Sequence, residues 1–142
     1  MVPMAETRKE RTAILVVDDY QAIGDILYEK LNSIGYYCYV VGSAQDALAK
    51  LGERPFDILL LDVKLPGKSG IDLLKDLKSS RPDTALIIIS AVVDLDTVLR
   101  ARTLWPCDYI IKPFNLNEVV LSVERMLEYR HLNDVWRRMS GV

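Results

Sequence analysis

The chain has 142 residues, which is enough for one ordinary domain and too short for two. Half of the residues are hydrophobic and 27% are charged, a balance that permits a packed core and argues against wholesale disorder. The formal net charge of −2 excludes a strongly basic nucleic-acid-binding protein. No apolar run approaches the roughly 20 residues that cross a bilayer, and Cys38 and Cys107 form neither a disulfide framework nor a metal-type spacing. We therefore expect a cytoplasmic protein that binds no membrane.

Short apolar runs alternate with amphipathic stretches along almost the whole chain. Residues 1–11 are expected to form a loose extension. The runs that follow are rich in β-branched residues and lack polar alternation, which is typical of strands buried on both faces of a parallel sheet. They lie at residues 13–17, 36–41, 58–61, 85–89 and 109–111. The stretches between and after them carry apolar residues at helical spacing. Five strands and five helices, joined by right-handed crossovers, predict an open α/β fold with helices on both faces.

Residues that are typical of helix ends lie between these segments, which supports the predicted α/β fold. Gly35 and Gly52 are expected to end the first two helices. Ser43 is expected to cap the start of the second helix. Asn115, with Glu118 three residues later, has the spacing of a capping box at the start of the last helix.

Polar side chains follow four of the five apolar runs. Asp18 and Asp19 follow the first, Asp62 the third, Ser90 the fourth and Lys112 the fifth. Ligands of open α/β sheets bind beyond the carboxyl ends of the strands, so these side chains are expected to share one site. Three neighbouring carboxylates repel one another unless a cation neutralises them. Oxygen ligands without His or Cys favour Mg²⁺, and a carboxylate beside a metal and a lysine suits phosphoryl transfer through an aspartyl phosphate.

Three runs of sequence resemble the receiver domain of bacterial two-component response regulators. They are residues 14–19 (Ile-Leu-Val-Val-Asp-Asp), 59–70 (Leu-Leu-Leu-Asp-Val-Lys-Leu-Pro-Gly-Lys-Ser-Gly) and 108–114 (Asp-Tyr-Ile-Ile-Lys-Pro-Phe). The resemblance covers roughly residues 12–128, which leaves residues 129–142 as a helical extension or linker. It implies a flavodoxin-like fold with strand order 2-1-3-4-5, and a phospho-switch in place of an enzyme.

The resemblance also implies roles for individual residues. Asp62 would accept a phosphoryl group from a histidine kinase or a phosphotransfer protein. The ligands of Mg²⁺, or alternatively Mn²⁺, would be Asp19, Asp62 and the backbone carbonyl of Lys64, with Asp18 holding a metal-bound water. Lys112 and Ser90 would bind the phosphoryl group, and Ser90 and Tyr109 would move inward together. The peptide bond between Lys112 and Pro113 would be cis, which X–Pro bonds tolerate.

Plainer readings of these residues remain open. Asp18 and Asp19 also suit the start of a helix, Asp62 suits a turn, and Tyr109 suits core packing. A Mg²⁺-dependent phosphohydrolase of the haloacid-dehalogenase type is a rival, although such enzymes carry Asp-x-Asp after the first strand. An interaction module that is never phosphorylated is a second rival. A dinucleotide-binding domain is disfavoured because no Gly-x-Gly-x-x-Gly follows the first strand.

Two stretches depart from the family pattern or extend beyond it. Trp105, followed by Pro106, stands where the family usually has Gly-Ala, which predicts an altered end of the fourth helix. Trp105 is either local core or an anchor for a partner or a dimer. In the tail, Tyr129, Leu132, Trp136 and Met139 follow spacings of 3, 4 and 3, which resembles a coiled-coil seam. The tail is either frayed or a linker helix, and a homodimer through it or through the face of helix four, strand five and helix five is expected. The chain itself is expected to bind no nucleic acid.

Overall fold

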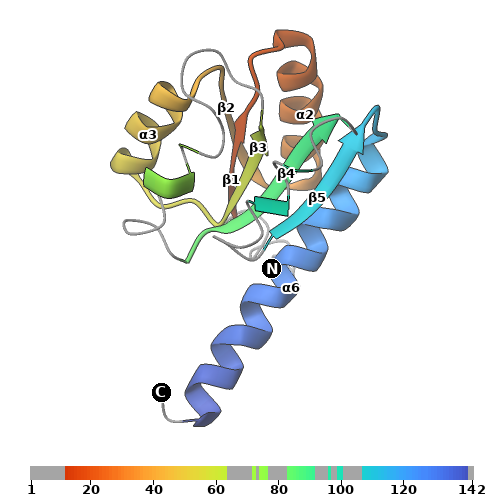
Figure 1. The fold of residues 1–142 in the computed structure, drawn as a ribbon. Coiled ribbons are helices and arrows are strands. Elements are labelled where there is room, and N and C mark those ends of the chain that lie inside the picture. Colours follow the sequence, from red (N-terminus) through yellow and green to blue (C-terminus); the bar gives the residue numbers. More distant parts are fainter. Residues whose placement is uncertain are drawn as a thin grey trace.

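The computed structural model describes residues 12–63, 72, 74–76, 83–91, 96, 99–100 and 107–140. Their five strands form one parallel sheet in the order β2-β1-β3-β4-β5, which is the flavodoxin-like order that the resemblance implies (Figure 1). The strands are β1 (Ala13–Val17), β2 (Tyr37–Val41), β3 (Ile58–Asp62), β4 (Ala85–Ala91) and β5 (Cys107–Lys112). All five residues of β1 and of β3 are buried, as expected for strands covered on both faces.

Three helices are described over their whole length, and they divide between the two faces of the sheet. These are α2 (Gln21–Ile34), α3 (Ala44–Glu53) and α6 (Leu116–Ser140). Leu27 and Leu31 of α2 share a core cluster with Val119 and Val123 of α6 on one face. Residues of α3, together with Leu74, pack on the other face. The fold class predicted from the sequence is therefore confirmed.

The helix boundaries follow the predicted caps, with one correction. Gly35 ends α2 at a φ of 114°, a left-handed conformation that glycine adopts without strain. The side chain of Ser43 accepts a hydrogen bond from the Asp46 N–H and so caps α3. The prediction that Gly52 ends this helix is wrong, because α3 continues through Gly52 to Glu53 and Arg54 is the cap. Arg54 is extended and its N–H donates to the Lys50 carbonyl, so no left-handed residue is needed there.

The start of α6 carries the predicted capping pair in a modified form. The Glu118 N–H donates to Asn115 Oδ1 at 2.9 Å. In return, Asn115 Nδ2 donates to Glu118 Oε1 at 3.1 Å, so the reciprocal bond joins two side chains. From this cap, α6 runs without a break to Ser140, beyond the predicted domain end at residue 128. The last helix is therefore a single long element, while the boundary itself stays a prediction. The chain segment at Trp105 lies outside the described residues.

Helix α2 approaches strand β2 closely at Gly24. A Cβ atom at this buried position would lie 2.8 Å from Val40 Cγ1. We expect Gly24→Ala to lower the free energy of unfolding by about 1–2 kcal/mol, because the overpacking outweighs the gain in helix propensity. Urea unfolding measures the change. The matched control measures Gly24→Ala in a Val40→Ala background, because Val40 also packs against the core. The cost of Gly24→Ala should be smaller there than in the native chain, and an equal cost in both backgrounds would contradict the steric explanation.

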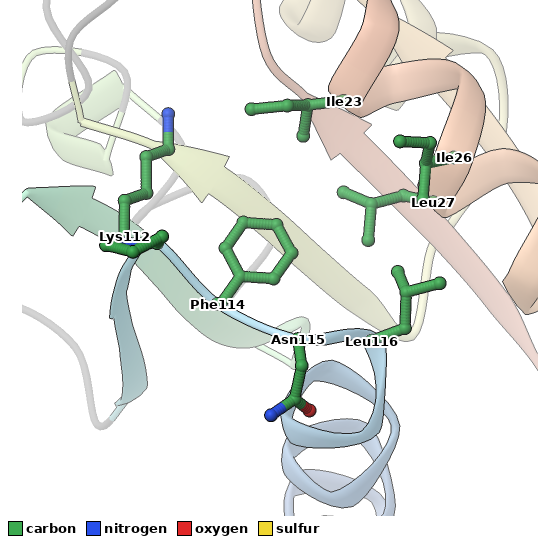
Figure 2. A pocket seen from close by; sticks show the side chains of 8 residues that line it. Ile23, Ile26, Leu27, Lys112, Phe114, Asn115 and Leu116 are labelled. Atoms are coloured by element: carbon green, nitrogen blue, oxygen red, sulfur yellow. The ribbon is translucent and has the colours of Figure 1, made fainter.

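An apolar pocket of about 620 Å³ lies between α2 and the segment that joins β5 to α6 (Figure 2). Ile23, Ile26 and Leu27 line it from α2, and Phe114 and Leu116 line it from the other side. Lys112 also lines this pocket, so the pocket adjoins the carboxyl end of β5. Within the described part of the chain, no helix is both long enough and apolar enough to span a membrane.

Candidate phosphoryl-acceptor site

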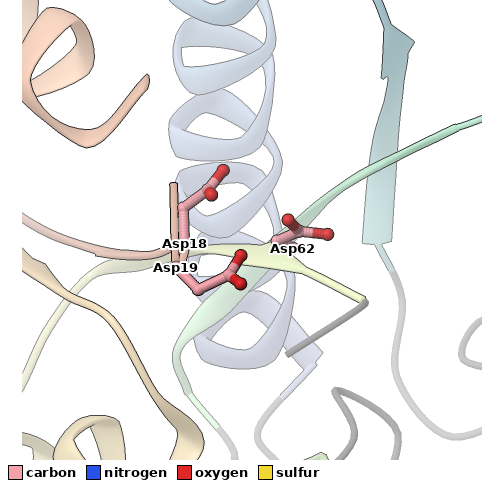
Figure 3. Close-up of side chains that lie close together, drawn as sticks. All are labelled: Asp18, Asp19 and Asp62. Atoms are coloured by element: carbon pink, nitrogen blue, oxygen red, sulfur yellow. The ribbon is translucent and has the colours of Figure 1, made fainter. Parts of the chain in front are cut away.

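Three carboxylates come together at the carboxyl ends of β1 and β3. The strand order reverses between these two neighbours, and ligands of open α/β folds bind at such a point. Asp18, Asp19 and Asp62 each offer an oxygen, and these oxygens lie within 4.8 Å of one another. Figure 3 shows Asp18 and Asp19 at the end of β1 beside Asp62 of β3. The predicted convergence of the three acids is therefore present in the structure.

The three acids differ in their exposure to solvent. Asp18 and Asp62 are 4% and 6% exposed, whereas Asp19 is exposed. Asp18 Oδ1 accepts a hydrogen bond from the Tyr20 N–H at 2.9 Å, just before α2 begins. Asp18 therefore accepts a donor next to the start of α2, but Tyr20 is the N-cap of this helix, so the plainer reading of Asp18 as the cap is not met. Asp18 Oδ2 is buried and has no hydrogen-bond partner among the described residues.

Lys112 supplies the positive charge at this edge of the sheet. Its Nζ donates to Asp62 Oδ2 at 2.9 Å and lies 3.8 Å from Asp18 Oδ2. Burial acts to lower the pKa of Lys112, but the hydrogen bond and the charge of Asp62, with Asp18 and Asp19, raise it above its ordinary value. Lys112 therefore stays charged, and within the described part of the chain this single cation faces the three acids.

Burial is also the main influence on Asp18. It raises the pKa of the Asp18 carboxyl above its ordinary value, while the Tyr20 N–H and Lys112 act in the opposite direction. Asp62 and Asp19 add repulsion that raises this pKa further. The cluster therefore has an excess of negative charge, which a divalent cation would relieve.

The remaining predicted site residues occupy different places. Ser90 is 1% exposed and follows Ile89, the residue of β4 that pairs with Asp62. Tyr109 is partly buried and packs against the core cluster on the α3 face. Lys64 and Trp105 lie outside the described residues, whereas Trp136 is described and is 63% exposed on α6. The peptide bond between Lys112 and Pro113 is cis, as the resemblance implies.

Sequence reasoning missed a polar network on β5 that reaches α6. Asp108 Oδ2 accepts hydrogen bonds from Ser122 Oγ at 2.6 Å and from Arg125 Nη2 at 2.8 Å. Asp108 Oδ1 accepts the Tyr109 N–H at 3.0 Å. Ser122 is fully buried, so its hydroxyl needs this partner. The sequence signal was a serine on the apolar face of the last helix, which by itself does not identify its acceptor.

This network makes folding stability depend on pH. Burial acts to raise the pKa of Asp108, but the bonds from Ser122 and Arg125 outweigh it and hold this pKa below its ordinary value. Because the pKa of Asp108 is lower in the folded protein than in the unfolded chain, its ionised carboxylate stabilises the fold at a pH above the ordinary carboxyl pKa. This stabilisation is lost as the pH falls through the pKa of the folded state. We expect Asp108→Asn to lower the free energy of unfolding at neutral pH by about 1–2 kcal/mol. The further fall in this free energy between neutral and acidic pH should be smaller in the variant than in the native chain. Urea unfolding at both pH values checks this, and an equal loss at both would contradict it.

Comparisons with known proteins agree with this geometry. The family model described as the response regulator receiver domain matches residues 14–124. The DNA-binding transcriptional regulator NtrC of Salmonella typhimurium is 35% identical over 120 residues, which are 84% of this chain and 26% of that protein. The chain thus spans about a quarter of the length of this curated relative.

Solved structures show the same relationship. NtrX from Brucella abortus superposes with a TM-score of 0.84 and 30% identity, over 89% of this chain and 29% of that one. A CheY-like receiver domain protein from Methanospirillum hungatei gives a TM-score of 0.81 and 28% identity, over 86% of this chain and 98% of that one. The match over most of the chain, the strand order and the acidic cluster lead to one conclusion: the chain belongs to the response regulator receiver domain family.

Proposed function

We propose that the chain is a phospho-accepting receiver that acts in the cytoplasm as part of a two-component system. Asp62 takes a phosphoryl group from a histidine kinase or a phosphotransfer protein with the help of Mg²⁺, or alternatively Mn²⁺. The observation that carries the proposal is the cluster of Asp18, Asp19 and Asp62, whose oxygens lie within 4.8 Å of one another beside Lys112. Such a cluster costs free energy unless it binds a cation, so a role in binding explains its presence.

The donor set at this site fits Mg²⁺. All three side chains offer hard oxygen ligands, and Asp18 Oδ2 is buried without a hydrogen-bond partner among the described residues. We assign Asp19 and Asp62 as direct ligands and Asp18 as the acceptor for a metal-bound water. The backbone carbonyl of Lys64 completes the proposed set. When bound, the ion supplies positive charge that neutralises the acids and the incoming phosphoryl oxygens.

The proposed transfer forms one bond and breaks one. A carboxylate oxygen of Asp62 attacks phosphorus, and the bond between phosphorus and the donor's nitrogen breaks, so that the imidazole leaves with the electron pair and is protonated. Lys112 already lies 2.9 Å from Asp62 Oδ2. It can therefore exchange this carboxylate for a phosphoryl oxygen without leaving the site. The site thus holds the nucleophile and a charged donor side by side.

The proposed switch uses the same edge of the sheet. The phosphoryl group adds about −1.5 to −2 charges, and Ser90 and Lys112 bind it. Tyr109 then moves inward, and the face that includes β5 and α6 changes for a partner, a second protomer or an output module. Ser90 lies next to the residue that pairs with Asp62, and Tyr109 is only partly buried, which supports these roles. Trp105, Tyr109 and Trp136 are the proposed interface residues.

The test is incubation of the full chain with a small phosphodonor, with Mg²⁺ and with excess chelator. We expect one phosphoryl adduct, detected by intact mass and mapped to the peptide that contains Asp62, only when Mg²⁺ is present. Size-exclusion chromatography then reports whether association changes. Sustained phosphate release from unrelated phosphate esters would favour the phosphohydrolase instead, and the absence of any adduct would favour the interaction module.

A further inference from the structure

The C-terminal half of α6 leaves the body of the protein as a projecting helix (Figure 1). Its buried residues are Val119, Ser122, Val123 and Met126, and none of the described residues after Met126 is buried. Residues 129–140 therefore lack the packing that normally fixes a helix in place. A helical segment of this length is marginal in water by itself, so its direction depends on whatever attaches it to the sheet.

The shortest polar contact between this segment and the described part of the sheet is an ion pair. Arg130 Nη1 lies 2.7 Å from Asp57 Oδ1, although the two residues are 73 positions apart in sequence. The side chains are 29% and 35% exposed, so solvent screens the pair only partly. The next ion pair along the helix, Arg137 with Asp83, is longer at 3.7 Å, and its side chains are 58% and 77% exposed. Among the described residues, Arg130 is therefore the last residue of α6 that forms a short, partly buried contact with the body of the protein.

Asp57 is a firm point of attachment because three strands hold it. Its Oδ2 accepts the Ala13 N–H at 2.8 Å, while its Oδ1 binds Arg130. Its backbone N–H donates to the Ala13 carbonyl, and its backbone carbonyl accepts the Ala85 N–H. It directly precedes β3, so β1, β3 and β4 all fix its position. Nearer the start of α6, Asp108 of β5 accepts hydrogen bonds from Ser122 and Arg125.

We propose that Asp57 and Arg130 form a positioning pair that fixes the direction in which residues 129–140 leave the receiver. Among the described residues, Asp108 is the first attachment of α6 at the sheet edge opposite the acidic cluster and Asp57 is the second, and the longer Arg137–Asp83 pair lies beyond them. The projecting segment is then a rigid arm. It presents Leu132, Trp136 and Met139, which are 57%, 63% and 82% exposed, at a defined place relative to the body.

The direction of the arm is measurable as a distance distribution between two spin labels. The full chain carries Cys107→Ser, Ala49→Cys on α3 and Arg138→Cys on the arm; Ala49 and Arg138 are exposed. Cys38 is 2% exposed, and burial raises the pKa of its thiol to about 12, so it stays unlabelled. We expect a single narrow distribution for this protein.

Removing the charge of Arg130 tests the pair. In Arg130→Gln we expect the distribution to become at least twice as wide, while the melting temperature changes little because no core residue is altered. Asp57→Asn should have the same effect, and Arg130→Lys should return towards the native width. Arg137→Gln is the matched control and should leave the width unchanged.

A native width in Arg130→Gln overturns the proposal, whatever Asp57→Asn does, since Asp57 also bonds to Ala13. An equal broadening in Arg137→Gln overturns it as well, because the longer pair of Arg137 with Asp83 would then fix the arm as firmly as Arg130 does. The experiment uses neither Mg²⁺ nor a phosphodonor, so its result does not depend on the proposed function.

Discussion

Replacing Asp62 by asparagine is expected to abolish the phosphoryl adduct. Asparagine keeps the size of the side chain but has no carboxylate oxygen to attack phosphorus. The effect should be a complete loss, because Asp62 is the carboxylate that lies 2.9 Å from Lys112 Nζ. Intact mass after incubation with a small phosphodonor and Mg²⁺ measures it, with native protein treated in parallel.

Asp25→Asn is the control for this substitution. Asp25 is an exposed acid on α2, so its replacement makes the same change of charge outside the cluster. We expect Asp25→Asn to form as much adduct as the native chain. Adduct on Asp62→Asn at the native level would refute the assignment of Asp62, whereas a loss in both variants would trace the effect to net charge.

Replacing Asp19 by asparagine is expected to remove about half of the stabilisation that Mg²⁺ gives. Asp19 is exposed, so the change should leave folding without the ion nearly intact. At about 100 times its dissociation constant, a ligand specific for the native state adds about 2.7 kcal/mol. A tenfold loss of affinity would remove about 1.4 kcal/mol of this. Thermal melts with and without Mg²⁺ measure the difference.

The same melts on Asp25→Asn show whether the effect belongs to the site. That variant should keep the full Mg²⁺-dependent rise in melting temperature. A native rise in Asp19→Asn would mean that Asp19 is no ligand, and the cluster would then need a different ligand set. A fall in melting temperature that is equal with and without Mg²⁺ would point to a structural role for Asp19.

The sequence predicted the fold and the convergence of the acids for a physical reason. Strands buried on both faces leave runs such as residues 58–61 without any polar residue, so the first charged residue after a run marks the carboxyl end of a strand. Asp18, Asp62 and Lys112 were located in this way, and parallel pairing brings such ends to one edge. Caps at Ser43 and Asn115 were readable because they depend on neighbours within three residues.

Contacts between residues that are far apart in the sequence could not be predicted from it. Asp57 and Arg130 meet only after the sheet has formed, and nothing near either residue indicates the other. The start of β5 at Cys107, two residues before the predicted run, reflects pairing with β4 and has no pattern of its own. The prediction that Gly52 ends α3 failed because it relied on the general preference of helix ends for glycine. In the structure, the Arg54 N–H donates to the Lys50 carbonyl and closes the last turn of α3 instead.

The length of α6 beyond Arg130 gives small rotations a large effect. Ser140 lies ten residues past Arg130, which is about 15 Å along a helix. A tilt of about 10° at the sheet would therefore displace the far end by almost 3 Å, roughly the width of a water molecule. Asp57 and Asp108 belong to the strand segments whose other ends carry Asp62 and Lys112. A small shift of β3 relative to β5, across the β4 strand that lies between them, would thus be magnified at the exposed side chains of Trp136 and Met139.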